Sequence, residues 1–259
     1  MSILICPVCG ESLYAQGNSL VCANRHSFDR AKEGYLNLLL SGQHRSKHPG
    51  DAPQLCRARR AFLSKGYYAP LRRFVTERIR GDVVLDACCG EGYYTCAAAE
   101  KHETYGFDIA KETVRLAAKQ DKRTQYFVAG LHRIPVRTGT VDTLMHLFAP
   151  FEDGEFCRVL KPGGTLLHVL PGELHLWGLK QALYKAPYRN RETPPQTVLT
   201  LVKTERLRYD VCLECTEDIL NLYGMTPYCY KTAQSGLQQL SALPKLETTL
   251  DFVVMTYTK

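Results

Sequence analysis

Short apolar runs and amphipathic segments alternate through the C-terminal two-thirds of the chain. The run Val83–Leu85 is apolar and β-branched, which is typical of a strand buried in a parallel sheet, and the glycines after it turn the chain into a helix from Gly92. The same alternation predicts strands at residues 105–109, 125–129, 143–148 and 165–170, a helix that starts at residue 111 and another that ends at residue 159. Segments 197–214 and 251–258 supply the last strands, with a helix from residue 216 between them. This order predicts an α/β fold with a doubly wound, mostly parallel sheet.

A basic helical segment precedes this domain, starting near Ala52. Leu55, Ala58 and Phe62 form an apolar stripe along this helix. Arg57, Arg60 and Ser64 form a polar stripe. We expect the apolar stripe to dock on the next domain, while the arginines meet solvent or phosphate. The connector before it turns basic and then breaks, at Gly42, His44, Arg45, Lys47, His48, Pro49 and Gly50.

The formal charge of +7 is unevenly placed. Residues 1–80 hold 13 Lys and Arg against 5 Asp and Glu, whereas the rest of the chain holds 20 against 21. Such asymmetry favours a polyanionic partner, and nucleic acid before a membrane because no strongly apolar amphipathic anchor accompanies it. A solvated basic helix without a partner is the alternative.

The cysteines and the hydropathy exclude two classes of protein. No apolar run approaches the roughly 20 residues of a membrane span, and no secretory leader is recognisable. The 11 cysteines are an odd number, and several lie within strand or helix patterns. We therefore expect a cytoplasmic protein in a reducing compartment, with some thiols used for metal.

The first thirty residues carry a zinc-binding pattern. Cys6, Cys9, Cys22 and His26 are spaced C-x2-C-x12-C-x3-H, and Gly10 suits the turn after the first pair. Four such ligands make a closed tetrahedral site, which is structural, and a segment this short would fold on the metal. The alternative is a chance spacing of reduced residues. A second C-x2-C, Cys212 and Cys215, lacks a partner pair, so we interpret it as packing near a strand end.

The turn in "VLDACCGEGYYT" points to a nucleotide-like cofactor. A dinucleotide fingerprint would need a third glycine where Thr95 stands. The pattern D-x-x-x-G-x-G, formed by Asp86, Gly90 and Gly92, instead resembles motif I of class I S-adenosylmethionine-dependent methyltransferases. Asp108 ends the next strand, placed to accept hydrogen bonds from ribose hydroxyls, and residues 161–164 resemble the turn before the fifth strand of that fold.

The whole chain is similar to one family, the zinc-binding bacterial 23S ribosomal RNA (guanine-N1)-methyltransferases. The resemblance rests on "CPVCG", "RHSFDRAKEGYLNLL", "ARRAFLSKGYY", "LDACCGEGYYT", "LHRIP", "PGELHL" and "LNLYGMTP", in this order. It implies methyl transfer from S-adenosylmethionine to N1 of a guanine in a hairpin loop near the peptide exit tunnel, by a homodimer whose zinc modules flank an RNA-binding cleft. It places the zinc ligands on the same cysteines and histidine as the spacing does, and cofactor contacts on Tyr68, Gly90, Glu91 and His175.

This resemblance divides the chain into three expected parts. Residues 1–35 form a zinc-binding module for RNA recognition, 36–80 a basic linker and helix, and 81–259 the methyltransferase domain. Two alternatives stay open: methyl transfer to another RNA, a protein or a small molecule, and a degenerate domain that binds RNA without catalysis. Assays with a panel of substrates would test the first alternative. Calorimetry with S-adenosylmethionine would test the second.

The sequence departs from the general fold at two places and identifies no general base. Cys88 and Cys89 occupy loop positions where a glycine often lies, and Leu131 stands where many relatives of the fold have an acid near adenine. Guanine N1 lies on the pairing edge, so the base should be unpaired or flipped into a pocket. In "HLFAPF", Phe148 is a candidate for stacking on that base and His146 a candidate for accepting its proton; the alternative is that His146 is a packed or hydrogen-bonded strand histidine.

Overall fold

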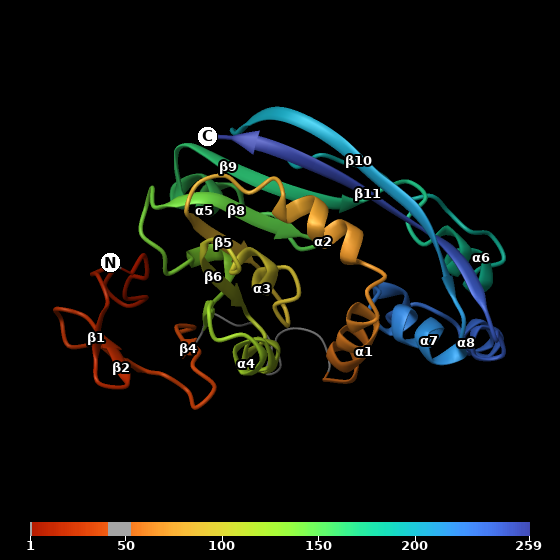
Figure 1. Ribbon diagram of the computed structural model, residues 1–259, viewed down its shortest axis with the longest axis horizontal. Helices are drawn as coiled ribbons and strands as arrows, with labels where there is room; N and C mark the ends of the chain where they lie inside the picture. Colours follow the sequence, from red (N-terminus) through yellow and green to blue (C-terminus); the bar gives the residue numbers. More distant parts are fainter. Residues whose placement is uncertain (1, 41–52) are drawn as a thin grey trace.

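The structure is a computed structural model that describes residues 2–40 and 53–259. The basic connector residues from Gly42 to Gly50 lie outside the described residues. An eight-stranded sheet forms the body of the protein, in the order β10-β11-β9-β8-β5-β6-β7-β4 (Figure 1). Strand β11 is antiparallel to both of its neighbours, and all other neighbours pair in parallel. The α/β fold with a mostly parallel sheet is confirmed.

The strands follow the expected order, with some ends displaced by a few residues. The eight strands of this sheet are β4 Leu36–Asn37, β5 Val83–Ala87, β6 Glu103–Asp108, β7 Gln125–Val128, β8 Val141–Leu147, β9 Leu160–Pro171, β10 Thr200–Leu213 and β11 Leu246–Thr258. Central strand β5 is almost wholly buried, as its apolar run requires. The last strand begins five residues before the expected segment, since Leu246 already pairs with Leu213.

Helices flank the sheet and gather at one end of it. The helices are α2 Ala69–Thr76, α3 Thr95–Ala98, α4 Lys111–Gln120, α5 Asp153–Val159, α6 Trp177–Leu183, α7 Thr216–Gly224 and α8 Gln234–Ser241, with 3-10 turns η1 Leu131–Arg133 and η2 Pro227–Tyr230. Helices α6, α7 and α8 lie with α1 (Pro53–Ser64) where the long strands β10 and β11 reach the end of the molecule (Figure 1). The helix expected from Gly92 starts at Thr95, because residues before it form the turns of the glycine loop.

The basic segment is two helices, which corrects the expectation of one. Helix α1 ends at Ser64, Gly66 adopts a φ of +85°, and α2 begins at Ala69 with Pro70 in its first turn. Of the expected apolar stripe, Phe62 is fully buried, and Ala58 lies against Gly224 of α7. The apolar stripe therefore docks on the C-terminal part of the chain, as α1 packs along α7.

The N-terminal module is a small antiparallel sheet that is docked on the main body. Its strands are β1 Tyr14–Gln16, β2 Ser19–Val21 and β3 Ser27–Asp29. The backbone of Ile5 donates to the carbonyl of Pro135 at 3.0 Å, and Leu4 forms a bridge with Val136. Leu4, Leu13 and Leu20 belong to the same apolar cluster as residues of β5, β6 and β7. The module thus shares its core with the large domain.

Candidate functional site

A cavity of about 780 Å³ opens at the carboxyl ends of β5, β6, β8 and β9. The chain leaves β5 toward β6 on one side and later returns to β8 on the other, so the crevice lies where the direction of strand progression reverses. Ligands of open α/β sheets bind at such a reversal. Six of the seven predicted cofactor residues line this cavity, namely Tyr68, Asp86, Gly90, Glu91, Asp108 and His175.

Backbone conformation explains the residues of the glycine loop. Gly90 has a φ of +54°, and a Cβ there would meet no atom within 4 Å, so its open side faces the space where a ligand can approach. Gly92, the seventh predicted residue, does not line the cavity: a Cβ there would lie 2.5 Å from the Tyr126 hydroxyl. Cys88 has a φ of +61°, so a cysteine adopts the left-handed conformation at the position where we noted the loss of a glycine.

Two carboxylates hold the loop from below. Asp86 is buried, and the hydroxyl of Thr95 donates to its Oδ2 at 2.6 Å. Burial raises the pKa of Asp86 to about 7, assisted by the charge of Asp108. Asp108 accepts the backbone N–H groups of Gly90 at 3.1 Å and Ala110 at 2.9 Å, one on each oxygen. A carboxylate at this position, lining the cavity, is of the kind that accepts hydrogen bonds from ribose hydroxyls.

Tyr68 and His175 meet on the opposite wall. The backbone N–H of Asp251 donates to Nδ1 of His175 at 3.3 Å, so the proton of the neutral ring is on Nε2. Nε2 lies 3.3 Å from the hydroxyl of Tyr68, which accepts that proton's hydrogen bond and keeps its own hydrogen for a ligand. Burial lowers the pKa of His175 to about 3 and raises that of Tyr68, so both side chains are neutral.

Asp251 is a site residue that sequence reasoning missed. It lies on β11, is fully buried, and its Oδ2 accepts the N–H of Leu174 at 3.0 Å. The guanidinium groups of Arg206 and Arg208 lie 3.0 and 2.9 Å from its carboxylate. Burial would raise the pKa of Asp251, but Arg208 and the Leu174 N–H outweigh it and the pKa is lowered. This ion cluster holds the loop that presents His175.

Of the two candidate residues at the end of β8, Phe148 lines the cavity and His146 does not. Phe148 lines the cavity, is 43% exposed, and has the left-handed φ of +56°, a strained conformation common at binding sites. His146 is fully buried and does not line the cavity; its Nε2 lies 2.9 Å from the carbonyl of Pro150 and its Nδ1 2.8 Å from Nδ1 of His168. His146 is therefore a packed histidine with both ring nitrogens engaged.

The side of the cavity next to Asp108 is mostly apolar. Ile109, Ala110 and Thr113 line it next to Asp108, whereas Leu131 does not reach it and packs against the apolar core.

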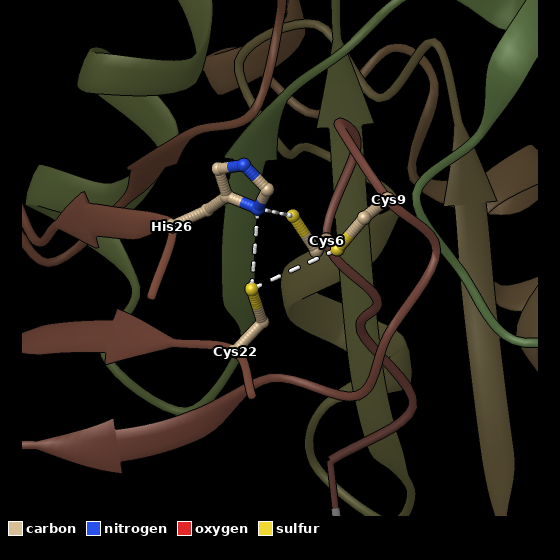
Figure 2. A group of neighbouring side chains, drawn as sticks. All are labelled: Cys6, Cys9, Cys22 and His26. Carbon is tan, nitrogen blue, oxygen red and sulfur yellow. Dashed lines mark hydrogen bonds between the residues drawn. The ribbon is translucent and has the colours of Figure 1, made fainter. Parts of the chain in front are cut away.

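The four predicted zinc ligands converge in the N-terminal module, where their side chains point toward one another (Figure 2). Nδ1 of His26 lies 3.5 Å from Sγ of Cys6 and 3.3 Å from Sγ of Cys22, and Sγ of Cys9 lies 3.7 Å from Sγ of Cys22. A tetrahedron with Zn–S of about 2.3 Å and Zn–N of about 2.0 Å has edges of about 3.5–3.8 Å. The donor set and its spacing therefore fit zinc. Among residues 2–40 and 53–259, no other group of three or more Cys, His, Asp and Glu side chains has this geometry.

Comparison with known proteins agrees with both the zinc-binding module and the methyltransferase domain. Residues 4–47 match the family described as "RlmA, N-terminal", a zinc ribbon, and residues 84–164 match "Methyltransferase domain". A 23S rRNA (guanine(748)-N(1))-methyltransferase of Streptomyces fradiae is 36% identical over 195 residues, which cover 70% of this chain and 67% of that protein. The chain belongs to the 23S rRNA (guanine-N1)-methyltransferase family.

Two further family members and one solved structure extend the comparison. A putative 23S rRNA (guanine-N(1)-)-methyltransferase of Micromonospora griseorubida is 36% identical over 67% of each chain. The putative enzyme YxjB of Bacillus subtilis is 28% identical, covering 98% of this chain and 96% of the other. The crystal structure of YcgJ from Bacillus subtilis superposes with a TM-score of 0.50 at 16% identity, covering 74% of this chain and 98% of that one, which supports the fold alone. This family member is thus an S-adenosylmethionine-dependent methyltransferase with a zinc ribbon.

Proposed function

We propose that the protein transfers a methyl group from S-adenosylmethionine to N1 of a guanine in a hairpin loop of 23S ribosomal RNA, near the peptide exit tunnel. The observation that carries this proposal is the family relationship, in which the Streptomyces fradiae relative is named for guanine N1. The cavity supports it, because its lining combines six of the predicted cofactor residues with Phe148 and further aromatic side chains. We place the reaction in the cytoplasm, in a homodimer. Among residues 2–40 and 53–259, no helix is long and apolar enough to cross a bilayer.

The bound cofactor would supply an activated methyl group on a sulfonium, so the protein chiefly aligns and shields the reactants. Asp108 and the open side of Gly90 would hold the ribose and methionyl part, with Tyr68 donating its hydroxyl hydrogen from the opposite wall. Asp86 stays beneath the loop as its support, and Glu91 adds a buried carboxylate to the cavity wall.

The target base would enter from the side of β8 and β9, where Phe148 presents its ring. The four residues after β8, Phe148 to Phe151, contain no carboxylate, and His146 is turned away from the cavity. We therefore assign loss of the N1 proton to water or to a group of the RNA. The zinc ribbon and the arginines of α1 would hold the flanking RNA backbone.

A reverse-transcription assay tests this function. A methyl group on N1 blocks the pairing edge of guanine, so the transcriptase should stop one nucleotide before the modified base. We expect that stop in large-subunit RNA from cells with the gene and full read-through in RNA from cells in which it is disrupted. Identical read-through in both RNAs would contradict the proposal.

A further inference from the structure

Lys180 is a buried cation whose role the methyl-transfer chemistry does not explain. It lies on α6 and its side chain is fully buried. Nζ donates to the carbonyl of Tyr188 at 2.9 Å and to Oδ1 of Asn190 at 2.6 Å. Both acceptors are neutral, and burial lowers the pKa of the ammonium. A buried lysine is costly, so an arrangement in which it binds neutral groups of one loop indicates that it orders that loop.

The loop that Lys180 orders is tied to the site. The side chain of Asn190 donates from Nδ2 to the carbonyls of Gly172 at 2.8 Å and His175 at 3.4 Å. Its backbone N–H donates to the carbonyl of Glu173 at 3.0 Å. Residues 188–190 are therefore fixed both to α6 and to the loop that presents His175, and Tyr188 and Asn190 line the cavity.

One face of the Tyr188 ring is in contact with Lys180, while the side chain is largely exposed. Nζ of Lys180 lies 4.5 Å from the centroid of the ring, in a cation–π contact that holds it from behind. The side chain is nevertheless 54% exposed. Among the residues that the structure describes, four large aromatic side chains are this exposed or nearly so, and three of them line this cavity: Phe148, Tyr188 and Tyr230.

The surroundings of Tyr188 carry positive charge. Lys185 and Arg191 lie on the same segment and are exposed, Arg189 is paired with Glu173 at 2.7 Å, and Lys231 follows Tyr230. Exposed aromatic rings interleaved with basic side chains are typical of surfaces that bind single-stranded nucleic acid, where the rings stack on bases and the cations follow the phosphates.

We propose that residues 184–191 form the substrate lip of the cavity, in which the exposed face of Tyr188 stacks on a base of the RNA substrate and Lys180 is the positioning residue that holds the ring. Lys185 and Arg191 would contact the phosphates that flank this base. The inference rests on the proposed function only in that the substrate is RNA.

Steady-state methylation of unmodified large-subunit RNA tests the lip. Loss of one base–aromatic stack costs about 1–3 kcal/mol, so Tyr188→Ala should raise KM for RNA about five- to 150-fold. Tyr188→Phe keeps the ring and should restore KM to within about threefold of wild type. Lys180→Met should raise KM in the same direction. The Kd for S-adenosylmethionine, measured by calorimetry, should stay within about twofold in both Tyr188 variants, and in Lys180→Met it should change less than KM does, because the loop that presents His175 keeps its hydrogen bonds to Asp251. Val202→Ala, an exposed apolar position on β10 outside the cavity, is the matched control.

The outcomes separate this inference from the proposed function. If wild type forms N1-methylguanosine and Tyr188→Ala leaves KM unchanged, the lip is wrong and the function stands. An equal fall in RNA and cofactor binding would also overturn the lip, because it would show a purely structural role. If wild type methylates RNA at another position, the proposed function fails, and a raised KM in Tyr188→Ala with rescue by Tyr188→Phe would still support the lip.

Discussion

The backbone N–H of Gly90 donates a hydrogen bond to Oδ2 of Asp108 at 3.1 Å, joining the loop after β5 to the end of β6. Oδ1 of the same carboxylate accepts the N–H of Ala110 at 2.9 Å. The acid that we expect to bind the ribose thus also fixes the glycine loop beside it. Loop geometry and cofactor affinity should therefore depend on the same side chain.

Replacing Asp108 should weaken cofactor binding strongly. Asp108→Ala removes charge-assisted hydrogen bonds to two backbone amides and to the ribose, so we expect the Kd for S-adenosylmethionine to rise about ten- to hundredfold. Asp108→Asn keeps an acceptor oxygen and should lose less. Isothermal titration calorimetry measures both variants. Unchanged affinity in Asp108→Ala would remove this residue from the site.

Replacing Asp251 should affect stability and the site together. Asp251→Ala leaves the Leu174 N–H without its acceptor and separates two guanidinium groups from their shared anion. Because both arginines are partly exposed and can be hydrated, we expect a loss of about 2–4 kcal/mol in the free energy of unfolding and weaker cofactor binding through His175. Asp210→Ala, at an exposed acid on β10, is the control and should change stability by less than about 0.5 kcal/mol. If urea titrations gave equal effects for the two substitutions, the ion cluster around Asp251 would not stabilise the protein as proposed.

Stability should fall between pH 6.5 and pH 4. Burial lowers the pKa of His146 and His175 to about 3 and that of His168 to about 4, against about 6.5 in the unfolded chain. Below pH 6.5 the unfolded chain therefore binds protons that the folded chain refuses, and the free energy of unfolding drops. Asp86 opposes this trend by one proton, because its folded pKa is raised to about 7.

Urea titrations at pH 7.5, 6 and 5 measure this dependence. With up to two net protons we expect a slope of as much as about 2.7 kcal/mol per pH unit. His168→Leu should be less stable at pH 7.5, since His146 loses its partner, but should show a shallower slope. A stability that is flat over this range would contradict the buried neutral histidines.

Zinc removal should weaken RNA binding far more than cofactor binding. The zinc ligands do not line the cavity, so Cys9→Ser should raise the Kd for RNA at least about tenfold and that for S-adenosylmethionine by less than about threefold. Cys215→Ser, in the other C-x2-C pair, is the matched control. Equal loss of both affinities would mean that the module supports the fold and does not bind RNA. Such a role would be explained by the packing of Leu4, Leu13 and Leu20 in the core of the large domain.

Local patterns were sufficient for the parallel strands and the metal site. The apolar run Val83–Leu85 and the spacing of the cysteines each depend on residues close together in the chain. The break between α1 and α2 also has a local signal, namely Gly66 and Pro70, but we predicted one helix because the helical pattern continues on both sides of the break. The alternation of strands and helices predicted a mostly parallel sheet, whereas the order of the strands within that sheet was not predicted.

Long-range pairing decides what the sequence could not predict. Asp251 reaches His175 only because β11 runs antiparallel to β9, which brings residues 76 positions apart to within a hydrogen bond. The packing of Gly92 against Tyr126 likewise depends on how β7 places that ring, which the sequence pattern does not reveal. Lys180 carries no motif, and its meaning appears only with Tyr188 and Asn190 beside it.

The most direct test of the central claim is transfer of labelled methyl groups from S-adenosylmethionine to large-subunit RNA that lacks the modification, with the product mapped by mass spectrometry. We expect the label in N1-methylguanosine, at a guanine of one hairpin loop near the exit tunnel. Label in another nucleoside, or no label from protein that binds the cofactor, would contradict the assignment of guanine N1 and leave the methyltransferase fold intact.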